Sequence, residues 1–300
     1  MIHTLDLNFL GDPKSIAAYV VESEDGPILF ETGPYSTLPH LKKGVEALGY
    51  HITDIRHVFI THIHLDHAGA AWALAEHGAT IYVHPRGAKH LAEPERLMSS
   101  ATRIYGEHMD RLWGAMNPIP RAQLRTMEDG TKLKIGGVKI RAWHTPGHAV
   151  HHIAWQVDNV NLIAGDVAGV KIMDGIAVPP CPPPDINLED WERSIRFILS
   201  RRYSNLYLTH FDAVKGTKNI KAHLTELRSR LRSWANWIKP YYEQEIPADE
   251  ITPKFEEYVN NQYDISGMPE ELKQYYQNAN PVWMSVAGLL RYWKKREQLV

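Results

Sequence analysis

The sequence predicts an α/β fold, because strand-like and helix-like segments alternate along the first two thirds of the chain. Residues 54–60 are β-branched and aromatic and predict a buried strand. Residues 70–77 predict a helix that ends at Gly78, and residues 80–84 predict a second strand closed by Pro85. Strand, helix, strand order is typical of α/β proteins. The 300 residues, 44% of them hydrophobic, are enough to bury a large core.

The flanking segments extend this pattern. Residues 2–10 and 16–22 predict a hairpin around a Gly-Asp-Pro turn, and residues 27–33 predict a third strand. Residues 38–48 carry apolar side chains at helical spacing and predict a helix that stops at Gly49. Further strands are predicted over 124–142, 153–157, 160–163 and 206–210, and an amphipathic helix over 188–199.

Two segments interrupt the alternation. Residues 86–120 are polar and helical, and they predict either a lid or pocket wall next to the histidine-rich loop at 61–69 or an ordinary packed pair of amphipathic helices. The proline-rich residues 178–185 exclude regular structure and predict an extended surface loop.

The character of the chain changes at Lys215. Apolar residues then recur every three or four positions and predict one long helix with an apolar seam. The seam residues are Ile220, Leu224, Leu227, Leu231, Trp234 and Ile238. Because such a seam has to be buried, we expect a main domain over 1–214 and a helical extension over 215–300 packed on it.

Composition limits the partners and the compartment. A formal charge of −2 and a pI near 6.8 leave no overall basic surface for a nucleic acid, so none is expected as a partner. The single cysteine, Cys181, excludes an intrachain disulfide and suits a reducing compartment. No signal peptide and no apolar run of about 18 residues is apparent, so we expect a cytoplasmic protein without a membrane partner. A homodimer is left open.

The residues with the clearest chemistry follow the strand at 54–60. Within Thr61–Gly69, three histidines and one carboxylate occupy six positions. On an extended backbone His62 and His64 point the same way and can share one ion, which leaves Asp66 and His67 to reach a neighbouring point. The spacing suits two adjacent metal ions, although histidines that merely cap a strand are the simpler alternative.

This stretch resembles the signature of the metallo-β-lactamase superfamily, and the partners that the resemblance requires follow in order. A Pro-Gly turn precedes His148, a strand end precedes Asp166, and another strand end precedes His210. The resemblance covers residues 1–214 and implies a four-layer αββα sandwich with the site at one edge. It assigns His62, His64 and His148 to a first metal, Asp66, His67 and His210 to a second, and Asp166 to a bridge between them.

Imidazole and carboxylate ligands without cysteine suit two divalent ions, with zinc preferred and iron or manganese as alternatives. Two such ions can share a water and lower its pKa towards about 7, so the resemblance implies attack of a bridging hydroxide on a carbonyl, with Asp66 as the catalytic group that moves the proton. Two further residues are expected around the ligands. Glu31 stands where the superfamily usually has an aspartate, and His152 matches a second histidine of glyoxalase II-like sequences.

The motifs specify the substrate class less closely than the metal site. The full ligand set looks most like the glyoxalase II and lactonase-type hydrolases, which implies a small ester, thioester or lactone as substrate. True β-lactamases lack the bridging carboxylate, and flavodiiron enzymes carry glutamate at the position of His64, so both are disfavoured. Two alternatives stay open: a phosphodiesterase or nuclease, and a mononuclear iron persulfide dioxygenase using His62, His64 and His148. Basic residues beside the helical seam, Lys218, Lys221, Arg228, Arg230 and Arg232, suit either a phosphorylated or carboxylated thiol carrier or a solvated helix face.

Overall fold

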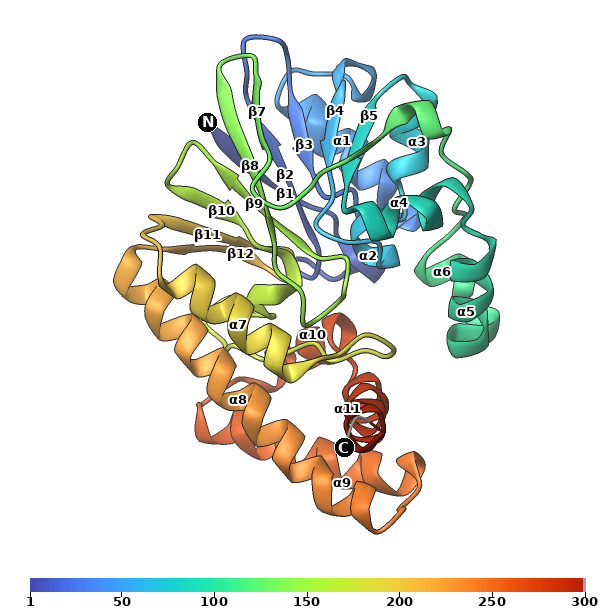
Figure 1. Cartoon of the computed structure of the whole chain (residues 1–300), viewed down its shortest axis with the longest axis vertical. Helices are drawn as coiled ribbons and strands as arrows, with labels where there is room; N and C mark the ends of the chain where they lie inside the picture. Colours follow the sequence, from blue (N-terminus) through green and yellow to red (C-terminus); the bar gives the residue numbers. More distant parts are fainter. Residues whose placement is uncertain (299–300) are drawn as a thin grey trace.

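The computed structural model describes residues 1–298 and shows two six-stranded β-sheets stacked face to face, with helices on both outer faces (Figure 1). The predicted α/β class and the four-layer αββα sandwich are therefore confirmed, and four helices follow the sandwich at the C-terminal end. The division of the chain after residue 214 stays a prediction, and residues 299–300 of the expected extension lie outside the described residues.

The first sheet has the order β1-β2-β3-β4-β5-β6. The first two pairings are antiparallel, and β3 to β6 run parallel. The strands are β1 (Ile2–Asp6), β2 (Ala17–Val21), β3 (Ile28–Phe30), β4 (His57–Phe59), β5 (Thr80–Val83) and β6 (Leu124–Thr126). The predicted hairpin and strands are found, with shorter ends. Strand β3 stops at Phe30 because Glu31 adopts a left-handed φ of 62°.

The second sheet has the order β12-β11-β10-β9-β8-β7. It is antiparallel except for the pairing of β10 with β11, so β8, β10 and β11 all run in the same direction. The strands are β7 (Lys132–Ile135), β8 (Val138–His144), β9 (Ile153–Val157), β10 (Asn161–Ile163), β11 (Asn205–Leu208) and β12 (Asp212–Lys215).

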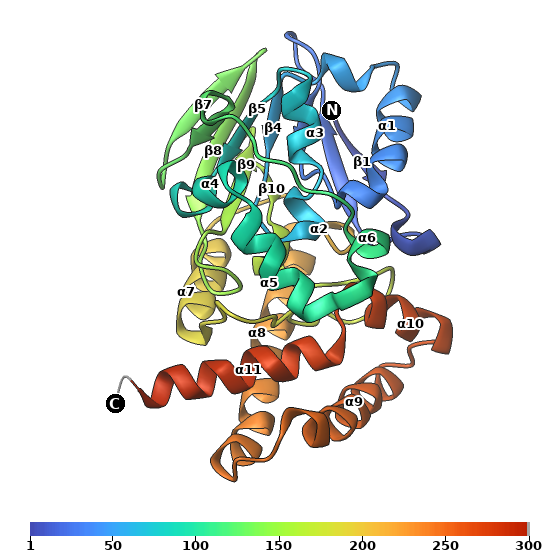
Figure 2. The same ribbon diagram turned by 90° about the vertical axis from the view of Figure 1, so that its right-hand side faces the viewer.

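Helices cover the outer faces of both sheets (Figures 1 and 2). On the first sheet lie α1 (Leu38–Ala47), α2 (Leu65–Ala68) and α3 (Ala71–Glu76), followed by α4 (Pro85–Ala92), α5 (Glu95–Tyr105) and α6 (Met109–Leu112). On the second sheet lie α7 (Leu188–Leu199) and α8 (Thr217–Glu243). The predicted helical segment 86–120 is thus α4 to α6, and it buries Leu91, Ala101 and Met109 in the core.

Alternation along the strands builds the two cores. Tyr19, Phe30, Phe59 and Tyr82 face the second sheet, whereas their neighbours Val20, Leu29, Val58 and Ile81 face the helices of the first sheet. The ring of Phe59 stacks at 4.2 Å from that of Tyr82 and meets the edge of Trp155 on β9 at 5.0 Å. Aromatic packing between the sheets therefore fixes the strand ends that carry the site.

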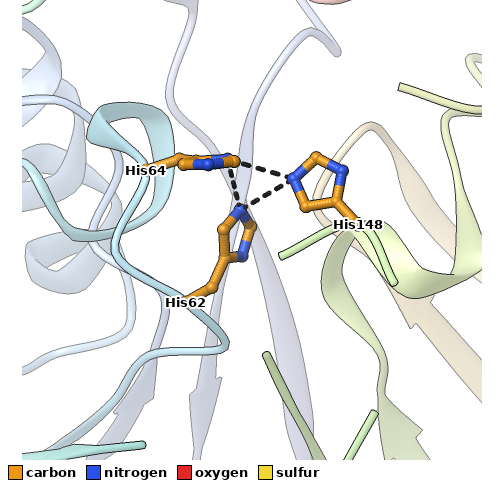
Figure 3. Close-up of side chains that lie close together, drawn as sticks. All are labelled: His62, His64 and His148. Carbon is orange, nitrogen blue, oxygen red and sulfur yellow. Dashed lines mark hydrogen bonds between the residues drawn. The ribbon is translucent and has the colours of Figure 1, made fainter. Parts of the chain in front are cut away.

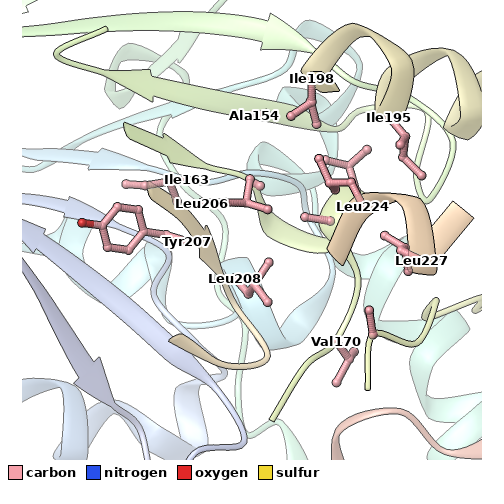
Figure 4. Close-up of a cluster of buried hydrophobic side chains, with 14 of the residues drawn as sticks. Ala154, Ile163, Val170, Ile195, Ile198, Leu206, Tyr207, Leu208, Leu224 and Leu227 are labelled. Carbon is pink, nitrogen blue, oxygen red and sulfur yellow. The ribbon is translucent and has the colours of Figure 1, made fainter. Parts of the chain in front are cut away.

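The second sheet repeats this division on β11. Leu206 and Leu208 turn towards Leu224 and Leu227 of α8, whereas Tyr207 turns to the opposite side, towards the first sheet (Figure 4). The ring of Tyr207 lies 5.1 Å from that of Tyr19. Because one strand contacts both α8 and the first sheet, the long helix is anchored directly behind the strand that ends at the site.

The C-terminal helices are α8, α9 (Ala248–Ile265), α10 (Glu270–Ala279) and α11 (Val282–Glu297). All six predicted seam residues of α8 are buried, which confirms the long helix with an apolar face. Helix α11 crosses both α8 and α9 (Figure 2). Although α8 has 27 residues, neither it nor any other helix within residues 1–298 qualifies as a bilayer-spanning segment.

The prediction of a surface loop over residues 178–185 is wrong for its first half. Val178 to Cys181 are buried, because α11 packs across them so closely that a Cβ atom at Gly288 would lie 1.9 Å from the carbonyl oxygen of Cys181. Burial raises the pKa of the Cys181 thiol, so this cysteine is no nucleophile. The loop instead joins the C-terminal helices to the sandwich.

Candidate metal centre

The candidate ligands lie where four strands end at one edge of the sandwich. His62 and His64 follow β4, His148 follows β8, Asp166 follows β10 and His210 follows β11. Since β8, β10 and β11 run in the same direction, their carboxyl ends meet at one edge, and the loop after β4 faces them. All seven residues predicted from the sequence are brought together, in three overlapping groups within which the ligand atoms lie within 4.8 Å of one another.

The first group is a triangle of imidazole nitrogens (Figure 3). His62 Nε2 lies 2.9 Å from His64 Nδ1 and 3.2 Å from His148 Nε2, and the last two nitrogens are 3.0 Å apart. Neighbouring ligand atoms of a tetrahedral zinc ion with bonds of about 2.0 to 2.1 Å lie about 3.3 Å apart. The three nitrogens therefore already have close to the spacing that one bound cation requires.

The hydrogen bonds around the triangle leave its nitrogens free to bind. His148 Nδ1 donates to the carbonyl oxygen of Pro180 at 2.9 Å, so Nε2 keeps its lone pair. His148 is held in place by Gly147, whose φ is 139° and where a Cβ atom would lie 2.2 Å from the Cα of Trp191. Burial lowers the pKa of His148 to about 4 and that of His62 well below its ordinary range, so both rings are neutral at pH 7.

The second group consists of Asp66, His67 and His210. Asp66 Oδ2 lies 3.3 Å from His210 Nε2 and 3.6 Å from His67 Nε2. His210 Nδ1 donates to the carbonyl oxygen of Ser15 at 2.8 Å, which directs its Nε2 lone pair at the carboxylate. His67 Nε2 is buried and has no hydrogen-bond partner within residues 1–298, as expected for an atom that binds a cation.

Asp166 lies between the two groups. Its Oδ2 is 3.4 Å from His148 Nε2, whereas its Oδ1 is 3.4 Å from His67 Nε2 and 3.7 Å from His210 Nε2. Oδ1 is also buried without a hydrogen-bond partner among the described residues. One oxygen for each group is the arrangement that a carboxylate bridging two cations would need.

The charges of the side chains around His67 also favour bound cations. Burial acts to lower the pKa of His67, but Asp166, Asp66 and Glu31 outweigh it and hold that pKa well above its usual range. Burial acts to raise the pKa of Asp66, but His67 and His210 outweigh it and hold that pKa below its usual range. The two buried carboxylates of Glu31 and Asp166 and the partly exposed one of Asp66 surround the His67 imidazole and leave an excess of negative charge that bound cations would neutralise.

A second layer of residues orients the ligands. Glu31 is fully buried, its Oε2 lies 3.4 Å from His67 Nδ1, and its Oε1 accepts a hydrogen bond from the backbone of Thr61 at 3.3 Å. Thr32 donates from its hydroxyl to the carbonyl oxygen of His67 at 2.9 Å. His152 contacts the hydroxyl of Thr145 through Nδ1 at 2.8 Å and lies outside the three ligand groups, and its supporting role stays a prediction.

The site opens into a cavity of about 960 Å³. His64, Asp66, His148, Asp166 and His210 lie on its wall, and further wall comes from α4 to α6, the proline-rich loop, the α10–α11 junction and the loop between β1 and β2. Of the histidines without a motif, His57, His84 and His144 have ordinary structural partners. His151 instead lines the cavity, 3.9 Å from Asp185. The sequence pattern did not single out His151 or Asp185, because neither belongs to a ligand motif.

A family model described as "Metallo-beta-lactamase superfamily" matches residues 11–210, the range that contains all seven predicted ligands. The chain belongs to the metallo-beta-lactamase superfamily. Members of this superfamily are metal-dependent hydrolases, and the His and Asp groups of this chain could hold the metal. The resemblance inferred from the motifs is thereby confirmed.

Several superfamily members are similar to this chain. The protein ST1585 of Sulfurisphaera tokodaii, described as metallo-beta-lactamase fold-containing, is 25% identical over 186 residues, which span 61% of this chain and 67% of that protein. The crystal structure of TTHA1429 from Thermus thermophilus, a metallo-beta-lactamase family protein, is 18% identical with a TM-score of 0.68 and covers 99% of this chain and 94% of that one. At this identity it shows the fold alone.

One fungal relative is named after an enzymatic activity. Thioesterase pkgB of Emericella nidulans is 28% identical over 199 residues, which span 65% of this chain. The match covers only 46% of that protein, so the chain spans about half the length of this curated relative.

Proposed function

We propose that this superfamily member is a dinuclear hydrolase that cleaves a small carboxylic ester, thioester or lactone. The observation that carries the proposal is the position of Asp166, which presents one oxygen to each of two ligand groups at the wall of a cavity. The name of the fungal relative, thioesterase pkgB, supports a thioester within this class.

Two divalent cations, zinc by preference, would be held by His62, His64 and His148 on one side and by Asp66, His67 and His210 on the other. When bound, such ions supply a water of lowered pKa and polarise a carbonyl oxygen. The ligand set without cysteine also admits iron or manganese.

The residues of the chain contribute orientation and proton transfer. His148 and His210 each fix one ring nitrogen by donating to a backbone carbonyl, which sets the direction of the other nitrogen. The side chain of Asp66 is 22% exposed and lies on the cavity wall, so its carboxylate can accept a proton from attacking water and return it to the leaving group.

The proposal is tested by elemental analysis of the purified protein, paired on the same sample with a panel of ester, thioester, lactone and phosphodiester substrates. We expect close to two metal ions per chain and turnover of at least one carbonyl substrate, abolished by a chelator and restored by zinc. One iron per chain with oxygen uptake and no hydrolysis would replace the proposal by the dioxygenase. Turnover of phosphodiesters alone would replace it by the phosphodiesterase.

A further inference from the structure

The cavity beside the metal centre has a cationic wall. Helices α4 to α6 contribute five exposed side chains to its lining, and none of the five lies within 4.0 Å of a carboxylate oxygen in the part of the chain that the structure describes. The five side chains, called the cationic wall below, are Arg86, Lys89, Arg96, Arg103 and Arg111.

Carboxylates do not balance this charge. Three acidic residues line the cavity, and two of them, Asp66 and Asp166, are candidate metal ligands whose charge the cations would more than offset. The third, Asp185, lies 3.9 Å from His151. The acidic residues of the same helical segment do not line the cavity, and Glu93 forms an ion pair with Arg121 instead. The cavity therefore attracts an anionic ligand.

Several cations elsewhere on the helices are paired. Arg230 pairs with Glu226, Arg232 with Glu192 and Lys273 with Asp264. The sequence left open whether the basic residues beside the α8 seam meet an anionic thiol carrier or form a solvated helix face, and none of those five lines the metal cavity. The unpaired cations that face the site lie on α4 to α6 instead.

Helix α5 places charge next to apolar surface. Arg96 and Arg103 are seven residues apart, about two helical turns or 10 Å along the axis. Leu97 and Ile104 each directly follow one of these arginines, Ala101 lies between them, and all three line the same cavity. Ile104 is 41% exposed although it is apolar. A ligand that covers this face would have several negative charges and an apolar portion.

We propose that the substrate is an acyl thioester whose thiol carries several phosphate groups, as in a nucleotide-bearing thiol of the coenzyme A type. The cationic wall binds the phosphates, and the acyl chain lies along the apolar face. A guanidinium group can bind two phosphate oxygens at once, and one carboxylate would need only one such group, whereas the cationic wall offers four guanidinium groups and the Lys89 ammonium. This inference rests on the proposed hydrolysis. Water adds to the carbonyl carbon, the C–S bond breaks, and the products are a carboxylic acid and the free phosphorylated thiol.

The test compares two thioesters with the same acyl group, butyryl-coenzyme A and butyryl-N-acetylcysteamine, whose thiol is uncharged. We expect kcat/KM of the metal-loaded enzyme to be about 100-fold higher for the phosphorylated thioester and to lose this advantage as ionic strength rises. The double variant Arg96→Gln, Arg103→Gln should lower the ratio of the two kcat/KM values about tenfold. The double variant Lys43→Gln, Arg202→Gln, with the same charge change on exposed residues outside the cavity, should keep the ratio.

A binding measurement separates this inference from the proposed function. Adenosine 3′,5′-bisphosphate, titrated calorimetrically, should bind the metal-loaded enzyme and bind the Arg96→Gln, Arg103→Gln variant about tenfold more weakly, with unchanged metal content. Binding without turnover of any ester, thioester or lactone would refute the hydrolase and leave the anion site standing. Equal kcat/KM for both thioesters, with no effect of the double variant, would overturn the phosphorylated thiol and leave the hydrolase. Preference for an uncharged thiol with a carboxylate-ended acyl chain would also overturn it.

Discussion

Glu31 Oε2 lies 3.4 Å from His67 Nδ1, and both side chains are fully buried. Glu31 replaces the aspartate that is usual for the superfamily at this position, and its longer side chain reaches both the ligand His67 and the backbone of Thr61. The Thr61 hydroxyl contacts the same nitrogen at 3.4 Å, so Glu31 and Thr61 together lie beside Nδ1 while Nε2 faces Asp66 and Asp166. The left-handed φ of Glu31 ends β3 and turns the side chain into the site.

Replacing Glu31 by glutamine should weaken metal binding by about 10-fold to 100-fold, because His67 loses the charged partner on its second nitrogen. The measurement is a zinc titration against a competing chelator. Glu46→Gln, on the exposed face of α1, is the control and should bind zinc as the unmodified protein does. Unchanged zinc affinity in Glu31→Gln would show that the charge of Glu31 does not contribute to metal binding and that its side chain only fills space beside His67.

Asp66→Ala should lower turnover by at least about 100-fold, because the variant loses both the proton acceptor and a ligand of the second group. The fold should persist, since Asp66 is one of three carboxylates that crowd His67. Circular dichroism and thermal unfolding check the fold, and elemental analysis should show close to one metal ion per chain. Asp185→Ala removes a carboxylate from the same cavity outside the ligand groups and should keep both ions. Undiminished turnover in Asp66→Ala contradicts the role of this residue.

The sequence predicted four of the ligands, His62, His148, Asp166 and His210, because each lies within four residues of a strand end. His64, Asp66 and His67 follow β4 by five to eight residues and were placed by their spacing in the motif, which puts His62 and His64 on the same side. The sequence could not predict how Asp166 divides its oxygens between the two groups, because that depends on the pairing of β10 with β11.

Other predictions were wrong or incomplete because helical spacing shows which side of a helix is apolar but not what that side contacts. The seam of α8 was correctly expected to be buried, yet nothing in the pattern showed that α11 would cover Val178 to Cys181. For the same reason the sequence offered the basic residues of α8 as candidates for binding an anionic thiol carrier, whereas it is Arg96 and Arg103 of α5 that line the cavity. Long-range packing, which decides both cases, leaves no local signal.

Gly288→Ala should lower the free energy of unfolding by about 2 kcal/mol, because the added methyl group would overlap the backbone carbonyl of Cys181. That carbonyl belongs to the main chain and cannot rotate away like a side chain. Urea unfolding measures the change. Lys294→Ala, on the exposed side of the same helix, is the control and should shift stability by less than about 0.5 kcal/mol. Equal stability of both variants would mean that α11 moves freely relative to the loop.

His223 should make the protein less stable in mild acid. Its Nε2 donates to the carbonyl oxygen of Ala168 at 2.7 Å, and its buried Nδ1 has no partner among residues 1–298. Burial lowers the pKa of His223 to about 4, below the unfolded value of 6.5, although the Ala168 carbonyl and Glu226 act to raise the pKa and Lys171 acts with burial. Between these values the unfolded chain binds more protons, so stability falls as pH drops from 6.5 towards 4.

The contribution of His223 between pH 7 and pH 5 is about 2 kcal/mol. His223→Gln keeps a donor near Ala168 but does not titrate, so its free energy of unfolding should fall by about 2 kcal/mol less over this range than that of the unmodified protein. Urea unfolding of the metal-loaded proteins at both pH values measures the difference, and acid loss of metal affects both alike. His108 is an exposed histidine on another helix, and the free energy of unfolding of His108→Gln should fall as much as that of the unmodified protein. Parallel pH profiles for His223→Gln and the unmodified protein would place the acid sensitivity elsewhere, in the buried imidazoles of the metal centre.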